Sequence, residues 1–261
     1  MLAKQTFWNL PQEKRKKIID VAIQEFATKG YQKASINTMI ANLGIAKGSI
    51  YQYFSNKESL FRYIFDYGLQ LIKDMVRQAE KDVLPGQDTF TKIQAFFSSA
   101  IQFVKNYPLI FRLYLRTIFE NDLPLKQELV ERIYLSSLGY LVPLLEEGKS
   151  RGEIRTDCQP HLVAFMIMAL VDRILQSYLC AHPDLLAHPE PAYASSPSSS
   201  TSPSSPGEPK VSSHGREATG KQAIPPYPAS SAFWIGPKDQ EQDLVAELID
   251  ILKRGLIASP Q

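Results

Sequence analysis

The stretch SINTMIANLGIAKGSIYQYFSNKESL, residues 35–60, constrains the fold of this chain most strongly. Apolar residues recur at helical spacing over residues 36–43, and Ser35 before them is a typical N-cap. Gly44 follows directly, and glycine commonly ends a helix because it adopts positive φ without strain. A second short helix is expected over residues 47–54. This order of helix, glycine turn and helix predicts a helix-turn-helix unit.

The second helix of such a unit enters the major groove of DNA, and the polar residues of this helix suit that role. Lysine neutralises phosphate, hydroxyl groups donate to phosphate oxygens, and glutamine forms a bidentate pair with an adenine edge. The residues concerned are Lys47, Ser49, Tyr51, Gln52 and Tyr53. A plain helical hairpin with a solvated polar face has the same periodicity, so spacing alone leaves both interpretations open.

The residues themselves resemble a known signature. Residues 43–60, L-G-I-A-K-G-S-I-Y-Q-Y-F-S-N-K-E-S-L, are similar to the pattern A-G-V-S-K-G-T-L-Y-x-Y-F-x-x-K-E-x-L of the TetR/AcrR family of bacterial transcriptional regulators. The resemblance covers the chain up to about residue 62. The DNA-contacting positions that it implies are Ser35, Lys47, Gly48, Ser49, Tyr51, Gln52, Tyr53 and Lys57. The chain departs from the family at Ala46, where a serine usually caps the second helix, and at Ile40, which replaces a common alanine.

Charge is distributed unevenly along the chain. Residues 1–62 hold ten Lys or Arg and four Asp or Glu, a net charge of +6, whereas the whole chain carries only +2. A basic head on an acidic body suits a polyanionic partner such as DNA, although a solvated lysine-rich helix produces the same asymmetry.

Cysteine spacing and apolar runs exclude several other classes of protein. Cys158 and Cys180 show neither metal-ligand nor disulfide spacing, so we expect no metal and no cofactor. The longest apolar run, residues 162–171, is far shorter than a bilayer span, and the N-terminus has no signal-peptide run. We therefore expect a cytoplasmic protein without membrane contact. No nucleophile elbow or dinucleotide fingerprint supports an enzyme.

The periodicity predicts an all-α chain of about nine helices. Residues 1–10 look like a loose arm before the first helix, with Phe7 and Trp8 as candidate packing anchors. Ser55 and Glu58 form an S-x-x-E capping box for a long helix. Asp88 is the expected cap of the helix after it, and Asp157 is the expected cap of a strongly apolar helix. Pro143 is expected to kink its helix. The expected helices lie at about residues 11–30, 36–43, 47–54, 56–83, 89–105, 109–119, 124–148, 161–179 and 239–257.

Composition divides the chain into four segments. Residues 183–237 hold eleven prolines and twelve serines, and such a tract buries too little apolar surface to fold. We expect a helix-turn-helix DNA-binding domain at 1–62, a helical regulatory body at 63–182, a disordered insertion at 183–237, and the last helix of the regulatory and dimerisation body at 238–261.

The resemblance implies a ligand-binding body whose last two helices form a dimer. Aromatic and methionine residues in that body indicate a pocket for a small hydrophobic or aromatic effector, although a close-packed core has the same pattern. The expected pocket residues are Phe96, Phe97, Phe103, Tyr107, Phe111, Tyr114 and Met166. The expected dimer-interface residues are Leu244, Leu248, Ile251 and Leu252. Asp172 and Arg173 interrupt the apolar helix at 161–179, and pairing across the dimer seam is favoured over a role in orienting a ligand.

The leading interpretation is a ligand-responsive repressor that binds a palindromic operator in double-stranded DNA as a homodimer. One alternative is a ligand-free, DNA-binding protein that organises the chromosome. Another is a protein-interaction module that acts through the Ser/Pro tract.

Overall fold

The computed structural model describes residues 2–46, 48–83, 86–119, 123, 125–182, 185 and 241–257. Within these residues the chain is all-α, as predicted, and an isolated bridge between Ile154 and Ile257 is its one strand-like pairing. The expected insertion at 183–237 lies outside the described residues except for Leu185, and so does Lys47. The helices are α1 Gln5–Trp8, α2 Gln12–Lys33, α3 Ile36–Leu43, α4 Ser49–Tyr53, α5 Lys57–Asp82, α6 Thr89–Asn106, α7 Pro108–Phe119, α8 Lys126–Ser150, α9 Pro160–Ala181 and α11 Glu241–Leu256.

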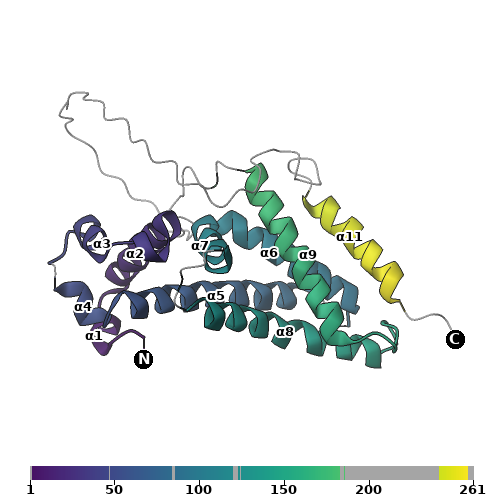
Figure 1. Ribbon diagram of the computed structural model, residues 1–261. Helices are drawn as coiled ribbons and strands as arrows, with labels where there is room; N and C mark the ends of the chain where they lie inside the picture. The colour runs from purple at the N-terminus through teal and green to yellow at the C-terminus, as the bar shows by residue number, and fades with distance from the viewer. Residues whose placement is uncertain are drawn as a thin grey trace, which may run out of the picture.

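Helices α1 to α4 gather at one end of the molecule around the start of the long helix α5 (Figure 1). Their shared core is aromatic, and its largest side chains are almost free of solvent: Phe26, Met39, Ile50, Phe54 and Phe61. Helix α2 is kinked at Gly30, where the first helix was expected to end: the φ of 73° and ψ of 171° at this residue are not helical, and α2 continues beyond the kink to Lys33. Four helices, α1 to α4, and the start of α5 therefore form the N-terminal unit, one short helix more than expected.

The N-terminal arm is not loose, contrary to the sequence expectation. Residues 5–8 form the short helix α1, and the side chain of Phe7 is completely buried. The Phe7 ring lies 5.0 Å from the Phe54 ring and 5.2 Å from the Tyr63 ring, measured between centroids. A four-residue helix has no apolar periodicity to detect, and it is held by these distant aromatic partners.

Two expected helix caps are displaced. Helix α5 is capped by Asn56, whose side chain accepts the Ser59 N–H at 2.8 Å while Ser59 Oγ accepts the Asn56 N–H at 3.1 Å, so the Ser55–Glu58 box is wrong by one residue. Helix α9 has Gln159 rather than Asp157 at its N-cap position, without a side-chain capping hydrogen bond, and Pro160 occupies the first helical turn.

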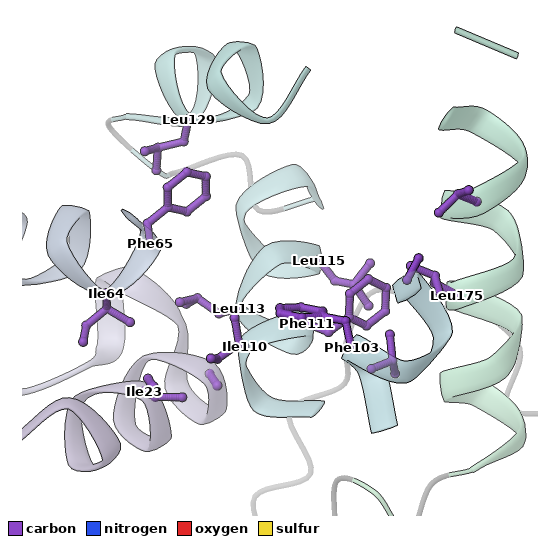
Figure 2. Close-up of a cluster of buried hydrophobic side chains, with 14 of the residues drawn as sticks. Ile23, Ile64, Phe65, Phe103, Ile110, Phe111, Leu113, Leu115, Leu129 and Leu175 are labelled. Atoms are coloured by element: carbon purple, nitrogen blue, oxygen red, sulfur yellow. The ribbon is translucent and has the colours of Figure 1, made fainter. Parts of the chain in front are cut away.

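Helix α7 lies at the centre of the molecule. Figure 2 shows Ile110 and Leu113 of α7 on the side of Ile23 and Ile64, from α2 and α5, and Phe111 on the side of Phe103 and Leu175, from α6 and α9. These residues belong to one continuous hydrophobic core that also contains the N-terminal core. The expected boundary at residue 62 falls inside α5, so the DNA-reading end and the body share both a helix and a core.

Helices α6, α8, α9 and α11 surround this centre. Asp88 caps α6 as predicted, accepting the Thr91 N–H at 2.7 Å. Helix α8 is continuous through Pro143. Helix α9 is long and apolar enough to span a membrane by length and composition, yet half of its apolar window is buried, and it packs against α6 and α8. These contacts are those of a core helix.

Candidate DNA-binding site

The turn between α3 and α4 has the geometry that the sequence predicts. Ser35 Oγ accepts the Thr38 N–H at 3.4 Å and caps α3. Gly44 ends the helix in the left-handed region, with φ 65° and ψ 34°, and its N–H bonds to the Ala41 carbonyl at 3.2 Å. A residue with a Cβ would be strained in this conformation, so glycine allows the chain to turn directly into α4.

Helix α4 presents its polar residues away from the core. Ile50 and Phe54 are each 2% exposed and anchor its inner side. Tyr51 is 47% exposed, and Gln52 is exposed beside it. Gly48 is also exposed, whereas Ser49 and Tyr53 are half-buried and lie closer to the core. Tyr51 and Gln52 therefore reach furthest toward a DNA groove.

Helix α1 holds the C-terminal end of α4. Lys4 Nζ donates to the Tyr51 carbonyl at 2.8 Å, the Lys4 N–H donates to the Tyr53 carbonyl at 2.9 Å, and Thr6 Oγ donates to the Gln52 carbonyl. The last carbonyls of a helix have no partner within it, and a five-residue helix is weak alone. We call Lys4, Thr6 and Phe7 the α1 clamp. Sequence reasoning missed this role, for which the apolar Phe7 was the only signal.

The ammonium group of Lys57 faces the end of α2. Its Nζ donates to the carbonyls of Gln32 and Ala34, both at 3.1 Å, and lies 4.7 Å from the centre of the Tyr31 ring. Burial lowers the pKa of Lys57 below its usual value. A lysine has three donors, so one remains for a phosphate oxygen. Lys57 joins α2 to α5 as well as standing at the predicted DNA-contacting position.

The backbone of Ser35 is also fixed. Its N–H donates to Glu25 Oε1 at 2.9 Å, and this buried carboxylate pairs with Lys29 Nζ at 3.0 Å. The start of α3 is thereby tied to α2, which sets the position of the helix-turn-helix pair on its supporting helix.

A cavity of about 580 Å³ lies among α5, α6, α7, α8 and α9. Its lining is mostly apolar, and four of the expected pocket residues contribute to it: Phe96, Phe103, Phe111 and Tyr114. Phe97, Tyr107 and Met166 do not line it. Met166 is 51% exposed on the outer side of α9, and Met168, two residues further along that helix, lines the cavity instead.

The cavity opens between α5 and α8. Its exposed lining residues all belong to these two helices, and they include Lys73, Arg77 and Glu80 of α5 and Leu135 of α8. Two cations and one carboxylate thus stand at the mouth, while α6, α7 and α9 form the inner wall.

Asp172 lies on this inner wall, and the expected place of its side chain at a dimer seam is wrong. Tyr114 Oη donates to Asp172 Oδ1 at 2.7 Å. Burial raises the pKa of the Asp172 carboxyl group above its ordinary value. Burial, together with the Asp172 carboxyl group, also raises the pKa of Tyr114. Arg173, the next residue, is exposed.

The outer side of α9 is apolar. Leu162, Phe165 and Met166, spaced three and four residues apart, are 56%, 54% and 51% exposed. On α11, Ile251 is 59% exposed, whereas Leu244, Leu248 and Leu252 are half-buried. Leu248 and Leu252 pack on the core of their own chain. The dimer stays a prediction, and the exposed apolar residues that suit it are Leu162, Phe165 and Met166 of α9 together with Ile251 of α11.

The capped α3, the left-handed glycine and the exposed polar side of α4 define the protein as a helix-turn-helix DNA-binding protein. Residues 18–64 match the family model described as bacterial regulatory proteins, tetR family. The N-terminal end of the chain therefore has the helix-turn-helix domain of this family of transcriptional regulators.

Two curated relatives come from Bacillus subtilis (strain 168). The chain is 25% identical to the uncharacterized HTH-type transcriptional regulator YhgD over 173 residues, 66% of this chain and 88% of that protein. It is 26% identical to the fatty acid metabolism regulator protein over 161 residues, 62% of this chain and 81% of that protein.

Solved structures share the fold. A TetR family transcriptional regulator from Chloroflexus aurantiacus J-10-FL superimposes with a TM-score of 0.60 at 24% identity, covering 97% of this chain and 98% of the other. The transcriptional regulator FadR from Bacillus subtilis, solved in complex with stearoyl-CoA, has a TM-score of 0.56 at 22% identity and covers 66% of this chain and 91% of the other.

Proposed function

We propose that this protein is a ligand-responsive repressor that binds a palindromic operator as a homodimer. The observation that carries the proposal is the exposed polar side of α4, held by α1 and joined through one core to a lined cavity. One five-residue reading helix offers little surface for specific binding, so two copies related by a two-fold axis are needed. Because the relatives of this protein are bacterial transcriptional regulators, we also propose that it is cytoplasmic.

For the ligand we propose a long acyl chain with an anionic head group, such as an acyl-CoA. The cavity is mostly apolar, and Lys73 and Arg77 stand at its mouth. One relative is named as a fatty acid metabolism regulator, and a structural neighbour was solved with stearoyl-CoA. A lined cavity favours this function over a ligand-free chromosome-organising protein.

Helix α7 offers a route from the cavity to the DNA-reading end. Phe111 and Tyr114 of this helix line the cavity. Two residues after Tyr114, Arg116 donates to the carbonyls of Ala27 and Thr28 in α2, from Nε and from a terminal nitrogen, both at 2.8 Å. A ligand that moves α7 therefore also moves α2, which carries α3 and α4. We propose that this movement changes the spacing of the two reading helices in the dimer.

The test measures binding of the full chain to its selected DNA site by fluorescence anisotropy, with palmitoyl-CoA or with coenzyme A alone. We expect palmitoyl-CoA to weaken DNA binding by at least about fivefold, a typical size of allosteric coupling, and coenzyme A to have no effect. If the protein binds DNA tightly and no acyl-CoA changes that affinity, the protein is still a DNA-binding protein, but the proposed response to a ligand is wrong.

A further inference from the structure

Asp172 is unusual for the wall of an apolar cavity. Among the described residues, Tyr114 is its one hydrogen-bond donor, and no described cation forms an ion pair with it. Three apolar residues line the same cavity as Asp172 and Tyr114, namely Phe103, Phe111 and Leu175, and Figure 2 shows these three in the core formed by α6, α7 and α9. Phe111 lies three residues before Tyr114 in the sequence, and Leu175 lies three residues after Asp172. The Asp172 carboxyl group has therefore exchanged its hydrogen bonds to water for one hydrogen bond from a neutral hydroxyl group.

This arrangement is costly for the empty or purely apolar-filled cavity. Burying a carboxyl group with incomplete hydrogen bonding is unfavourable, and a bare hydrocarbon chain against it would exclude water without replacing the lost bonds. A hydroxyl or ammonium group placed there would supply the missing donor. A carboxylate would instead meet a group of the same charge or one competing for the same protons.

We propose that Asp172 and Tyr114 form a polar subsite that selects a ligand bearing a hydrogen-bond donor, a hydroxyl or an ammonium group, at the end of its apolar chain that enters the cavity. This inference rests on the proposed function in that it uses the same cavity. The anionic head of the ligand stays at the mouth with Lys73 and Arg77, and the donor at the far end binds Asp172. The cavity thus distinguishes a chain functionalised at its far end from a plain one.

The experiment measures direct binding to the full chain by calorimetry, without DNA. The probes share one chain length: dodecanoate, ω-hydroxydodecanoate, ω-aminododecanoate and dodecanedioate. We expect the hydroxyl and amino probes to bind at least about tenfold more tightly than dodecanoate, since a site built for a donor rejects an analogue that lacks it. Dodecanedioate should bind most weakly, because one of its carboxylates must approach Asp172.

Variants assign this preference to the subsite. In Asp172→Leu the order should reverse, so that dodecanoate binds more tightly than ω-hydroxydodecanoate. Asp172→Asn should keep the preference for the hydroxyl probe and lose any advantage of the amino probe. Asp157→Leu changes an exposed carboxylate in the loop before α9, and as the matched control it should leave the order unchanged. Asp172→Asn also covers the case in which Asp172→Leu does not fold, and Tyr114→Phe, which keeps the carboxyl group, should keep the preference.

The outcomes separate the two proposals. If dodecanoate binds as tightly as the ω-hydroxy probe in the wild type, or if Asp172→Leu keeps the wild-type order, the polar subsite is wrong while the acyl-binding cavity stands. If none of the four probes binds, the cavity is not an acyl-ligand site, and both this inference and the proposed ligand response are overturned.

Discussion

Gln52 is the residue on which base reading depends most in this account. Its side chain is exposed on α4, while its backbone carbonyl is held by Thr6. We expect Gln52→Ala to change which bases the protein prefers, with a loss of about 1–3 kcal/mol at the base pair that the amide contacts. Competition between operator variants that differ at single positions measures this. If the variant instead loses the same affinity for every sequence, Gln52 contacts the DNA backbone rather than a base.

Lys57 has a structural and an electrostatic role, and one substitution tests both. Lys57→Ala removes two hydrogen bonds from a cation to the last carbonyls of α2, which we expect to lower the free energy of unfolding by about 1–3 kcal/mol. It should also weaken binding to all DNA sequences alike and reduce the salt dependence by about one unit, for one lost phosphate contact. If the variant melts at a lower temperature but the salt dependence of DNA binding is unchanged, the role of Lys57 is only to stabilise the end of α2.

The sequence predicted helix caps best where a single residue at the start of the helix could serve as the cap. Ser35 and Asp88 are isolated caps, and both were predicted correctly. Ser55 and Asn56 are adjacent residues that both favour a cap position, and the spacing did not distinguish them. Asp172 was placed at a dimer seam because burial of its charge was judged from α9 alone, whereas its partner Tyr114 comes from α7.

At the scale of elements, α1 should control the order of α4. Thr6→Val keeps the shape and charge of the side chain but removes the hydrogen bond to the Gln52 carbonyl, worth about 0.5–1.5 kcal/mol. We expect faster amide hydrogen exchange in α4, DNA affinity lower by about twofold to tenfold, and little change in the melting of the body. Thr28→Val is the matched control, since its hydroxyl bonds only within α2 and should leave exchange in α4 unchanged. Equal exchange in both variants would contradict the clamp.

The long helices were predictable because each has a broad apolar side and clear ends. The short helix α1 was not, since its stability comes from rings that are distant in sequence, Phe54 and Tyr63. Helix α9 shows a different limit of prediction from sequence. Residues around most of its circumference are apolar, so periodicity does not tell which side faces the cavity, and Met166 was chosen where Met168 lines it.

At the scale of the whole molecule, the account requires a dimer, and the structure suggests a cleaner test than the α11 residues. Leu248 packs on the core of its own chain, so Leu248→Glu would destabilise the monomer as well as an interface. Phe165 is 54% exposed, and Phe165→Glu should fold normally. At an interface it buries an unpaired carboxylate, which costs several kcal/mol. Sedimentation should therefore show a wild-type dimer and a Phe165→Glu monomer at micromolar concentration. A monomeric wild type with tight DNA binding would refute this arrangement.

The all-α fold and the helix-turn-helix unit followed from the sequence, because they depend on local spacing and caps. The cavity, its mouth between α5 and α8, and the joining of α7 to α2 did not, because they depend on how helices far apart in the chain pack together. The proposal of a repressor bound to a palindrome rests on the fold and the helix-turn-helix unit, and the proposed ligand chemistry rests on the cavity.

The most direct measurement is selection of DNA from a randomised duplex pool by the full-length protein, with Gln52→Ala selected in parallel. The account predicts an enriched inverted repeat whose half-sites lie about one helical turn or more apart, and a changed base preference within each half-site for the variant. A wild-type pool without any enriched sequence, or one enriched in a single half-site that Gln52→Ala selects equally, would contradict it.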